Sequence, residues 1–173
     1  MNLEPLNHAK KSTTPPTHKA GRSPDERATG IAWNDPTVRL RSSPHCIKIG
    51  VNDVWRLQGE WNGQKFVPFA EYKANYLKLL ETARAVGIRK LVLMSPSAIA
   101  DNQNEEMSRH LDERAACVQE LAARFGAIYV PIREIQKRAM RQYPKVKWTT
   151  DGCHPTTDGH ALFAHAWIEA VGL

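Results

Sequence analysis

The sequence predicts an α/β fold in which helices cover both faces of a parallel β-sheet. From about residue 45 onward, short apolar segments alternate with longer segments whose apolar residues recur every three or four positions. The segment 91–94, Leu-Val-Leu-Met, is continuously apolar, as expected of a parallel strand that is buried on both faces. Such alternation implies right-handed crossover connections and a three-layer α/β/α arrangement.

The apolar pattern places the individual elements. Strands are expected at 46–49, 89–94 and 127–132, and helices at 69–86, 105–125, 134–142 and 157–171. Gly50 is expected to end the first strand, whereas Gly87 and Gly126 end the first two helices. The residues after Gly50, including Val54 and Trp55, are expected to begin a loop.

Residues 1–44 differ in composition from the rest of the chain. They contain six of the eleven prolines, seven Lys or Arg residues and four Asp or Glu residues, without a sustained apolar period. Such a segment cannot bury enough apolar area to offset its conformational entropy, so we expect it to be disordered. The sequence therefore divides into a Pro-rich basic tail or displaced N-terminus at 1–44 and a domain at 45–173.

Composition and motif content argue against several other classes of protein. The net charge of +6 is not gathered into a basic helix face or an aromatic–basic motif, so no nucleic-acid partner is expected. Three widely spaced cysteines without Cys-x-x-Cys indicate reduced thiols and a cytoplasmic location. No run of 18 apolar residues predicts a membrane span. No cofactor or metal is expected, because His160 and His165 fall on different helix faces and do not combine with His154.

Two short motifs contain the candidate catalytic residues. In Asp151-Gly-Cys-His154-Pro155, before the last helix, the carboxylate can hold one ring nitrogen while the other faces outward as a general base. In Gly50-Val-Asn52-Asp53, after the first strand, the Asn52 amide can donate a hydrogen bond to a developing oxyanion. Taken alone, the first motif is also typical of a helix cap or surface pair, and Asn52 of a turn residue.

Other chemically capable side chains are weaker candidates. Ser95 and Ser97 follow the second predicted strand, but neither sits on the strand-to-helix elbow that exposes a nucleophile. Trp55 and Trp61 could line an acyl or sugar pocket, although packing in the core or at a rim is the more ordinary role.

Together, the motifs at 50–53 and 151–155 resemble the third and fifth blocks of the SGNH hydrolases, also called GDSL esterases and lipases. The resemblance covers roughly residues 45–173. It implies a five-stranded, flavodoxin-like sheet of order 2-1-3-4-5, with the active site outside the carboxyl ends of the strands. There His154 would act as the base, Asp151 would orient it, and Asn52 would donate to the oxyanion.

The sequence departs from this family in its first two blocks. The Gly-Asp-Ser that carries the nucleophilic serine occurs nowhere in the chain, and the second-block glycine has no identifiable counterpart. The resemblance thus implies a hydrolase of small-molecule esters, acylated sugars or short acyl esters, that lacks its first two strands and is impaired or inactive as written.

Two further expectations follow from the missing blocks. The alternative function is a non-catalytic module that binds a carbohydrate or protein partner. A nucleic-acid-binding module, which the sequence pI of about 9.4 alone would suggest, is the least supported. Without the first strand, 46–49 would leave an apolar sheet edge through which copies of the chain could associate.

Overall fold

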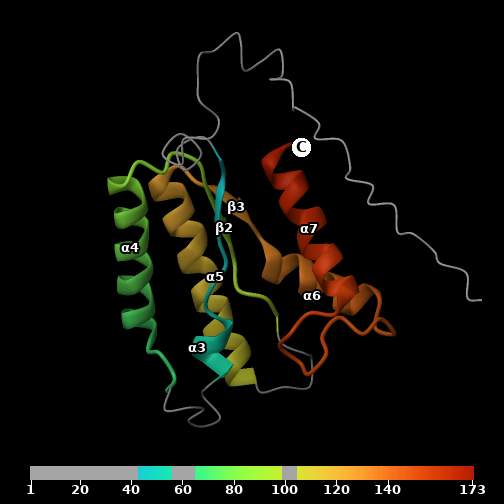
Figure 1. Ribbon diagram of the computed structural model, residues 1–173. Helices are drawn as coiled ribbons and strands as arrows, with labels where there is room; N and C mark the ends of the chain where they lie inside the picture. The colour runs from blue at the N-terminus through green and yellow to red at the C-terminus, as the bar shows by residue number, and fades with distance from the viewer. Residues whose placement is uncertain (1–42, 56–64, 99–104) are drawn as a thin grey trace, which may run out of the picture. The chain divides into compact units, whose positions relative to one another are not determined.

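The computed structural model describes residues 43–55, 65–98 and 105–173, all within one compact unit. The predicted disordered tail up to residue 42 and Trp61 lie outside these ranges. The described elements, shown in Figure 1, are β1 (His45–Ile47), α3 (Val51–Trp55), α4 (Phe69–Ala85), β2 (Leu91–Met94), α5 (Glu105–Phe125), β3 (Ile128–Val130), α6 (Ile132–Gln142) and α7 (Thr157–Val171).

The described strands form a parallel sheet in the order β1-β2-β3. His45 is in register with Leu91, and Val92 is in register with Ile128. Among the described residues β1 therefore pairs on one side only, with β2. This is the order expected for the third, fourth and fifth strands of the predicted sheet, and the predicted parallel α/β fold is confirmed.

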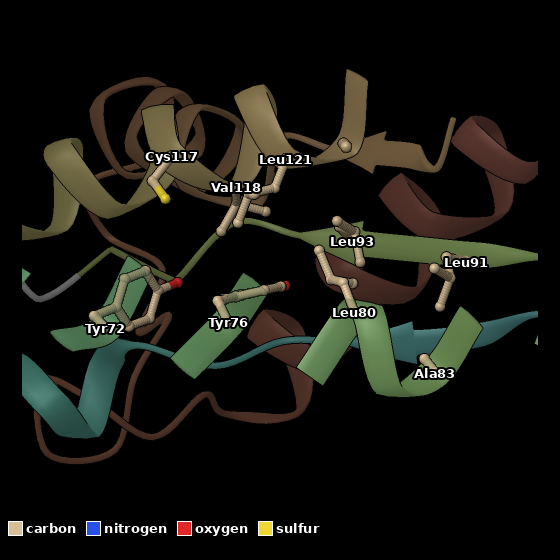
Figure 2. Packing of buried hydrophobic residues seen from close by; sticks show 10 residues of the cluster. Tyr72, Tyr76, Leu80, Ala83, Leu91, Leu93, Cys117, Val118 and Leu121 are labelled. Atoms are coloured by element: carbon tan, nitrogen blue, oxygen red, sulfur yellow. The ribbon is translucent and has the colours of Figure 1, made fainter. Parts of the chain in front are cut away.

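Helices α4 and α5 cover one face of the sheet, and α6 and α7 cover the other (Figure 1). Alternate residues of β2 explain why it is apolar throughout: Leu91 and Leu93 face α4 and α5, whereas Val92 and Met94 face α6 and α7. The first layer buries its apolar residues in one cluster, shown in Figure 2: Tyr72, Tyr76, Leu80, Ala83, Leu91, Leu93, Cys117, Val118, Leu121 and Ala122.

The prediction of a loop after Gly50 is wrong, because the chain enters helix α3 directly. Gly50 has φ 121°, and a Cβ there would lie 3.0 Å from Cγ of Pro96, so the turn requires glycine. Val54 is buried with Met107 and Leu111 of α5. This tertiary contact holds a five-residue helix that is too short to show a clear apolar period.

The predicted strands are also too long. The predicted residues 48–49, 89–90 and 131–132 lie outside the paired residues of the sheet. Ile132 is fully buried, but it is the first residue of α6 rather than the last residue of a strand. Apolar character reports burial, and burial extends past the end of the hydrogen-bonded ladder.

Neighbouring leucines of α4 offer a matched test of the first core layer. Leu80 is fully buried, whereas Leu79 is 42% exposed. Leu80→Ala should lower the free energy of unfolding by about 2–5 kcal/mol, because it removes apolar contacts and leaves a cavity. Leu79→Ala should change it by less than about 1 kcal/mol. Urea unfolding followed by circular dichroism measures both, and equal losses would contradict the packing of α4 described here.

Candidate active site

A pocket of about 760 Å³ opens at the carboxyl ends of β1 and β2. Its walls come from the segment 48–53, from the side of α4 that carries Tyr72 and Tyr76, and from the residues that follow β2. The loop before α7 closes it with Cys153, His154 and Pro155. Asn52 and His154, which are a hundred positions apart in the sequence, therefore line one pocket.

Asp151 and His154 form a closely bonded pair. The Oδ2 atom of Asp151 lies 2.7 Å from Nδ1 of His154. Because an ionised carboxylate can only accept, Nδ1 carries a proton, which leaves Nε2 as the ring nitrogen that can act as a base. Oδ1 of Asp151 accepts hydrogen bonds from the backbone N–H groups of His154, at 2.8 Å, and Cys153, at 3.0 Å. The carboxylate thus holds both the imidazole and the backbone that carries it.

These hydrogen bonds also set the charge of Asp151. The backbone N–H of His154, its ring and the N–H of Cys153 all stabilise the ionised form and hold the pKa of Asp151 well below its ordinary value. Asp151 is therefore a carboxylate throughout the neutral range. A fixed negative charge beside Nδ1 stabilises an imidazolium when Nε2 takes a proton.

The loop that carries the pair is closed on itself at 148–156. The N–H of Thr156 donates to the carbonyl of Trp148 at 3.1 Å, and the N–H of Thr150 donates to the carbonyl of His154 at 2.7 Å. Gly159 in α7 sits so close that a Cβ there would lie 2.5 Å from the Trp148 carbonyl oxygen. Only glycine permits this packing of the loop on the helix.

Thr156, not Asp151, caps helix α7. Its Oγ1 accepts a hydrogen bond from the N–H of Gly159 at 3.3 Å. The alternative that Asp151 serves as a helix cap is therefore wrong. Asp151 and His154 are both largely exposed, but His154 lines the pocket, so the two residues are not an isolated surface pair.

Asn52 is exposed on α3 and lines the pocket. Its helix is anchored through the next segment, because the N–H of Val67 donates to the carbonyl of Asp53 at 3.2 Å. The fully buried guanidinium of Arg114 in turn donates to the Val67 carbonyl and lies 5.1 Å from the ring centre of Tyr72. A buried arginine of α5 thus holds the segment that presents Asn52.

A family model of GDSL-like lipases and acylhydrolases matches residues 25–162. The chain belongs to this family. The resemblance predicted from the two motifs is thereby confirmed, although the match begins upstream of the predicted domain boundary at His45.

The chain is also similar to proteins described as esterases or hydrolases. An acetylxylan esterase from Geobacillus stearothermophilus is 24% identical over 141 residues, which are 81% of this chain and 64% of that protein. The solved structure of Axe2, an acetylxylan esterase from the same organism, superposes with a TM-score of 0.66 at 25% identity, covering 86% of this chain and 67% of that one. LAE5, an α/β hydrolase enzyme from the metagenome of Lake Arreo, Spain, shares the fold with a TM-score of 0.64, 24% identity and coverage of 83% and 69%.

The chain spans 64% of the length of this curated relative. Solved catalytic mutants of Axe2 replace a serine, an aspartate or a histidine with alanine, and the aspartate lies three positions before the histidine.

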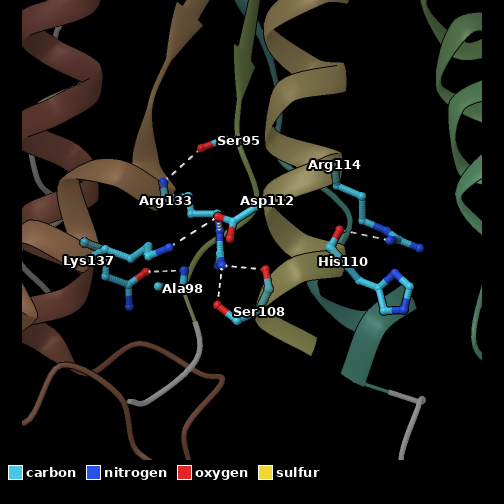
Figure 3. A network of polar contacts seen from close by, with 9 residues as sticks. Ser95, Ala98, Ser108, His110, Asp112, Arg114, Arg133 and Lys137 are labelled. Atoms are coloured by element: carbon cyan, nitrogen blue, oxygen red, sulfur yellow. Dashed lines mark hydrogen bonds and ion pairs between the residues drawn. The ribbon is translucent and has the colours of Figure 1, made fainter. Parts of the chain in front are cut away.

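Both serines that follow β2 are buried. Ser95 accepts a hydrogen bond from the backbone N–H of Arg133 at 2.9 Å. Figure 3 shows the network around this contact, in which Arg133 donates to Asp112 at 2.6 Å and to Ser108 at 2.8 Å. Ser95 therefore helps to hold the residues after β2 on α6. Ser97 lines the pocket, where Nζ of Lys48 donates to its hydroxyl at 3.4 Å.

Sequence reasoning missed Lys48 and Cys153 as pocket residues. The ammonium group of Lys48 lies 5.0 Å from the ring centre of Phe163, and burial lowers its pKa. Burial also raises the pKa of Cys153 to about 11, so its sulfur is a protonated thiol at neutral pH and a poor substitute nucleophile. The only available signal was position, since Lys48 lies near the end of the first predicted strand and Cys153 lies beside His154.

The remaining sequence candidates fall into ordinary structural roles. Trp55 packs, partly buried, beside Val54 against α5, while His165 lies 3.5 Å from Glu169 on α7. In the portion of the chain that the structure covers, no group of three or more His, Cys, Asp or Glu side chains could hold a metal ion. No described helix is long and apolar enough to cross a membrane.

The depressed pKa of Asp151 gives a testable dependence of stability on pH. Because the folded state favours the ionised form, the contribution of Asp151 is fully present above its unfolded pKa of about 3.8 and is lost as the pH falls below that value. Asp151→Asn should therefore be less stable than the wild type at pH 7, and the difference should shrink at pH 3. Urea unfolding at both values tests this, with Glu81→Gln on α4 as the exposed control. A pH-independent difference would contradict it.

Proposed function

We propose that this chain provides the base and one oxyanion donor of an SGNH-type acetyl esterase. The observation that carries the proposal is the 2.7 Å contact between Asp151 and His154, in a loop that lines the same pocket as Asn52. Two findings support it: the match to the GDSL-like family and the catalytic aspartate and histidine of Axe2, which have the same spacing. The proposed substrates are small-molecule esters, and the relatives favour acetyl groups on xylan-type sugars.

In a complete site, the serine hydroxyl attacks the ester carbonyl while Nε2 of His154 takes its proton. Asp151 stabilises the resulting imidazolium, and the Asn52 amide donates to the oxyanion. His154 then returns the proton to the departing sugar hydroxyl, which leaves an acetylated serine. Water activated by the same base releases acetate and restores the serine.

The chain as written lacks the Gly-Asp-Ser block that supplies the nucleophile. Without this serine no acyl-enzyme forms, and direct attack by water lacks the backbone donors of the first and second blocks. Removal of a single oxyanion donor typically costs about 10²–10³ in rate. We therefore infer that the chain is impaired or inactive on its own, although Asp151 still holds the ring of His154.

The absent serine block also favours a second candidate, a non-catalytic module that binds a carbohydrate or protein partner. In that case the pocket would retain ligands without turning them over. Binding of an acetylated sugar that is unchanged in His154→Ala, with no turnover under any complementation, would favour this alternative over the esterase half-site.

Activity measurements test the esterase proposal. The chain should hydrolyse p-nitrophenyl acetate no faster than its His154→Ala variant, and a fluorophosphonate probe for serine hydrolases should not label it. Addition of the missing strand and Gly-Asp-Ser loop, fused or as a separate fragment, should restore both signals in the wild type. It should restore neither hydrolysis in His154→Ala nor normal rates in Asn52→Ala.

Two outcomes would contradict the proposal. Probe-sensitive turnover by the unmodified chain would show that another residue, such as Ser97, acts as nucleophile, and mapping of the labelled peptide would identify it. Equal restoration of activity in the wild type and His154→Ala would remove His154 from the mechanism.

The edge of β1 gives a prediction about association. Ile49, just after this strand, is 42% exposed, and unpaired parallel edges recruit other strands. We propose that the chain forms a dimer or larger species through this edge. Sedimentation velocity should show this, and Ile49→Lys should shift the distribution toward monomer. A monomeric wild type with an accessible β1 edge in hydrogen exchange would contradict it.

A further inference from the structure

A second depression lies on the helical face formed by α6 and α7, away from the pocket that contains His154. It consists of two hollows, of about 250 and 490 Å³, that share the residues Tyr143, Trp148, Leu162 and His165, and the larger hollow is shallow and open. The shared residues join the hollows into one groove, called here the α6–α7 groove, which runs across the segment between the helices. None of these four residues lines the candidate active site.

Two aromatic side chains form the apolar part of the α6–α7 groove. Tyr143 is 52% exposed, whereas Tyr72 and Tyr76 are buried in the core. Nε1 of Trp148 donates to the backbone carbonyl of Tyr143 at 3.3 Å. The polar edge of the indole is therefore bonded to the protein and its ring is fixed. Rigid aromatic rings offer contact area at a low cost in side-chain entropy.

Hydrogen-bonding side chains of both charges surround these rings. On α6 they are Arg138 and Gln142, and on α7 they are Asp158, His165 and Glu169. Aromatic faces beside planar donors and acceptors suit a sugar, whose C–H faces are apolar and whose edge carries hydroxyls. The two carboxylates make the groove unsuitable for a phosphate backbone, and its polar rim makes it unsuitable for an acyl chain.

Trp148 connects the α6–α7 groove to the loop that carries Asp151 and His154. Trp148 begins the closed segment 148–156, and its carbonyl accepts the hydrogen bond from Thr156 that closes it. The same carbonyl packs against Gly159 of α7. A ligand on the indole ring therefore contacts the loop whose central residues are Asp151 and His154.

We propose that the α6–α7 groove binds a linear neutral oligosaccharide. Its sugar rings stack on Tyr143 and Trp148, and its hydroxyls bond to Arg138, Gln142 and Glu169. Such a site holds the polymer by unmodified sugars, while the pocket at His154 receives the ester. The choice of a xylan-type chain as ligand rests on the proposed function, whereas the existence of the groove does not.

The experiment uses the full chain and unacetylated xylohexaose, which carries no ester for the pocket. Heteronuclear NMR should show saturable shifts of the Trp148 indole resonance and of backbone amides at 142–149. Tyr143→Ala should weaken binding about tenfold or more, equivalent to roughly 1.4 kcal/mol. Tyr143→Phe should retain most of the affinity because the stacking surface remains, and Gln142→Ala should show a smaller loss than Tyr143→Ala.

Matched controls separate the groove from the pocket and from general surface effects. Ile168→Ala, on an exposed residue of α7 outside the groove, should bind xylohexaose like the wild type. His154→Ala should do the same. Because the loop depends on Trp148, the Trp148→Ala variant is informative only together with its circular dichroism spectrum. The decisive comparison is therefore made with the Tyr143 variants.

Three results would overturn the proposal: no saturable shifts, binding that Tyr143→Ala leaves unchanged, or shifts confined to the residues around His154. A dimer that Tyr143→Ala dissociates, without any response to xylohexaose, would show that a second copy of the chain occupies the groove, and would overturn it as well. If the complemented chain shows no esterase activity but still binds xylohexaose, the proposed function is wrong and the proposal for the α6–α7 groove stands.

Discussion

Strand β2 has no face exposed to water, and the rest of the described domain depends on that constraint. Leu91 and Leu93 are buried under α4 and α5, whereas Val92 and Met94 are buried under α6 and α7. Its backbone groups must be paired on both sides as well, which requires β1 and β3. The parallel register then places the carboxyl ends of β1 and β2 side by side, so that Gly50 lies too close to Pro96 to carry a side chain. The pocket forms where these two ends and the loop before α7 meet.

Long elements were predictable because several turns repeat the same apolar spacing. The boundaries of α4, α5 and α7 agree with the sequence pattern to within a residue, and glycines with positive φ follow all three. Helix α3 was not predictable, because its five residues span less than two turns and Val54 is held by Met107 and Leu111 of a distant helix. The ends of the strands were misplaced for a related reason: Ile132 is buried like a strand residue but already belongs to α6.

In the candidate site, too, contacts within one short segment were predictable, whereas contacts between distant segments were not. The Asp151–His154 contact was predictable from spacing, since the two residues lie in one short loop and are three positions apart in the sequence. Lys48 was not, because its contacts with Ser97 and Phe163 join three segments that no local pattern relates. The position of Asn52 was predicted from its motif, but its support by Arg114 depends on a helix sixty positions later and could be found only in the structure.

Each half of the candidate site is maintained by contacts that do not involve a serine block. Oδ1 and Oδ2 of Asp151 bond only within the next three residues, as far as the described contacts show, and the loop is closed by Trp148 and Thr156 and packed on Gly159. The segment of Asn52 is held from the other side of the sheet by α5. In the proposed esterase, the base and the oxyanion donor are oriented by separate parts of the scaffold and need no nucleophile to stay in place. A missing serine block would remove one chemical step and leave these contacts intact, and this is the physical reason to expect that a supplied Gly-Asp-Ser segment would find a partner site already formed.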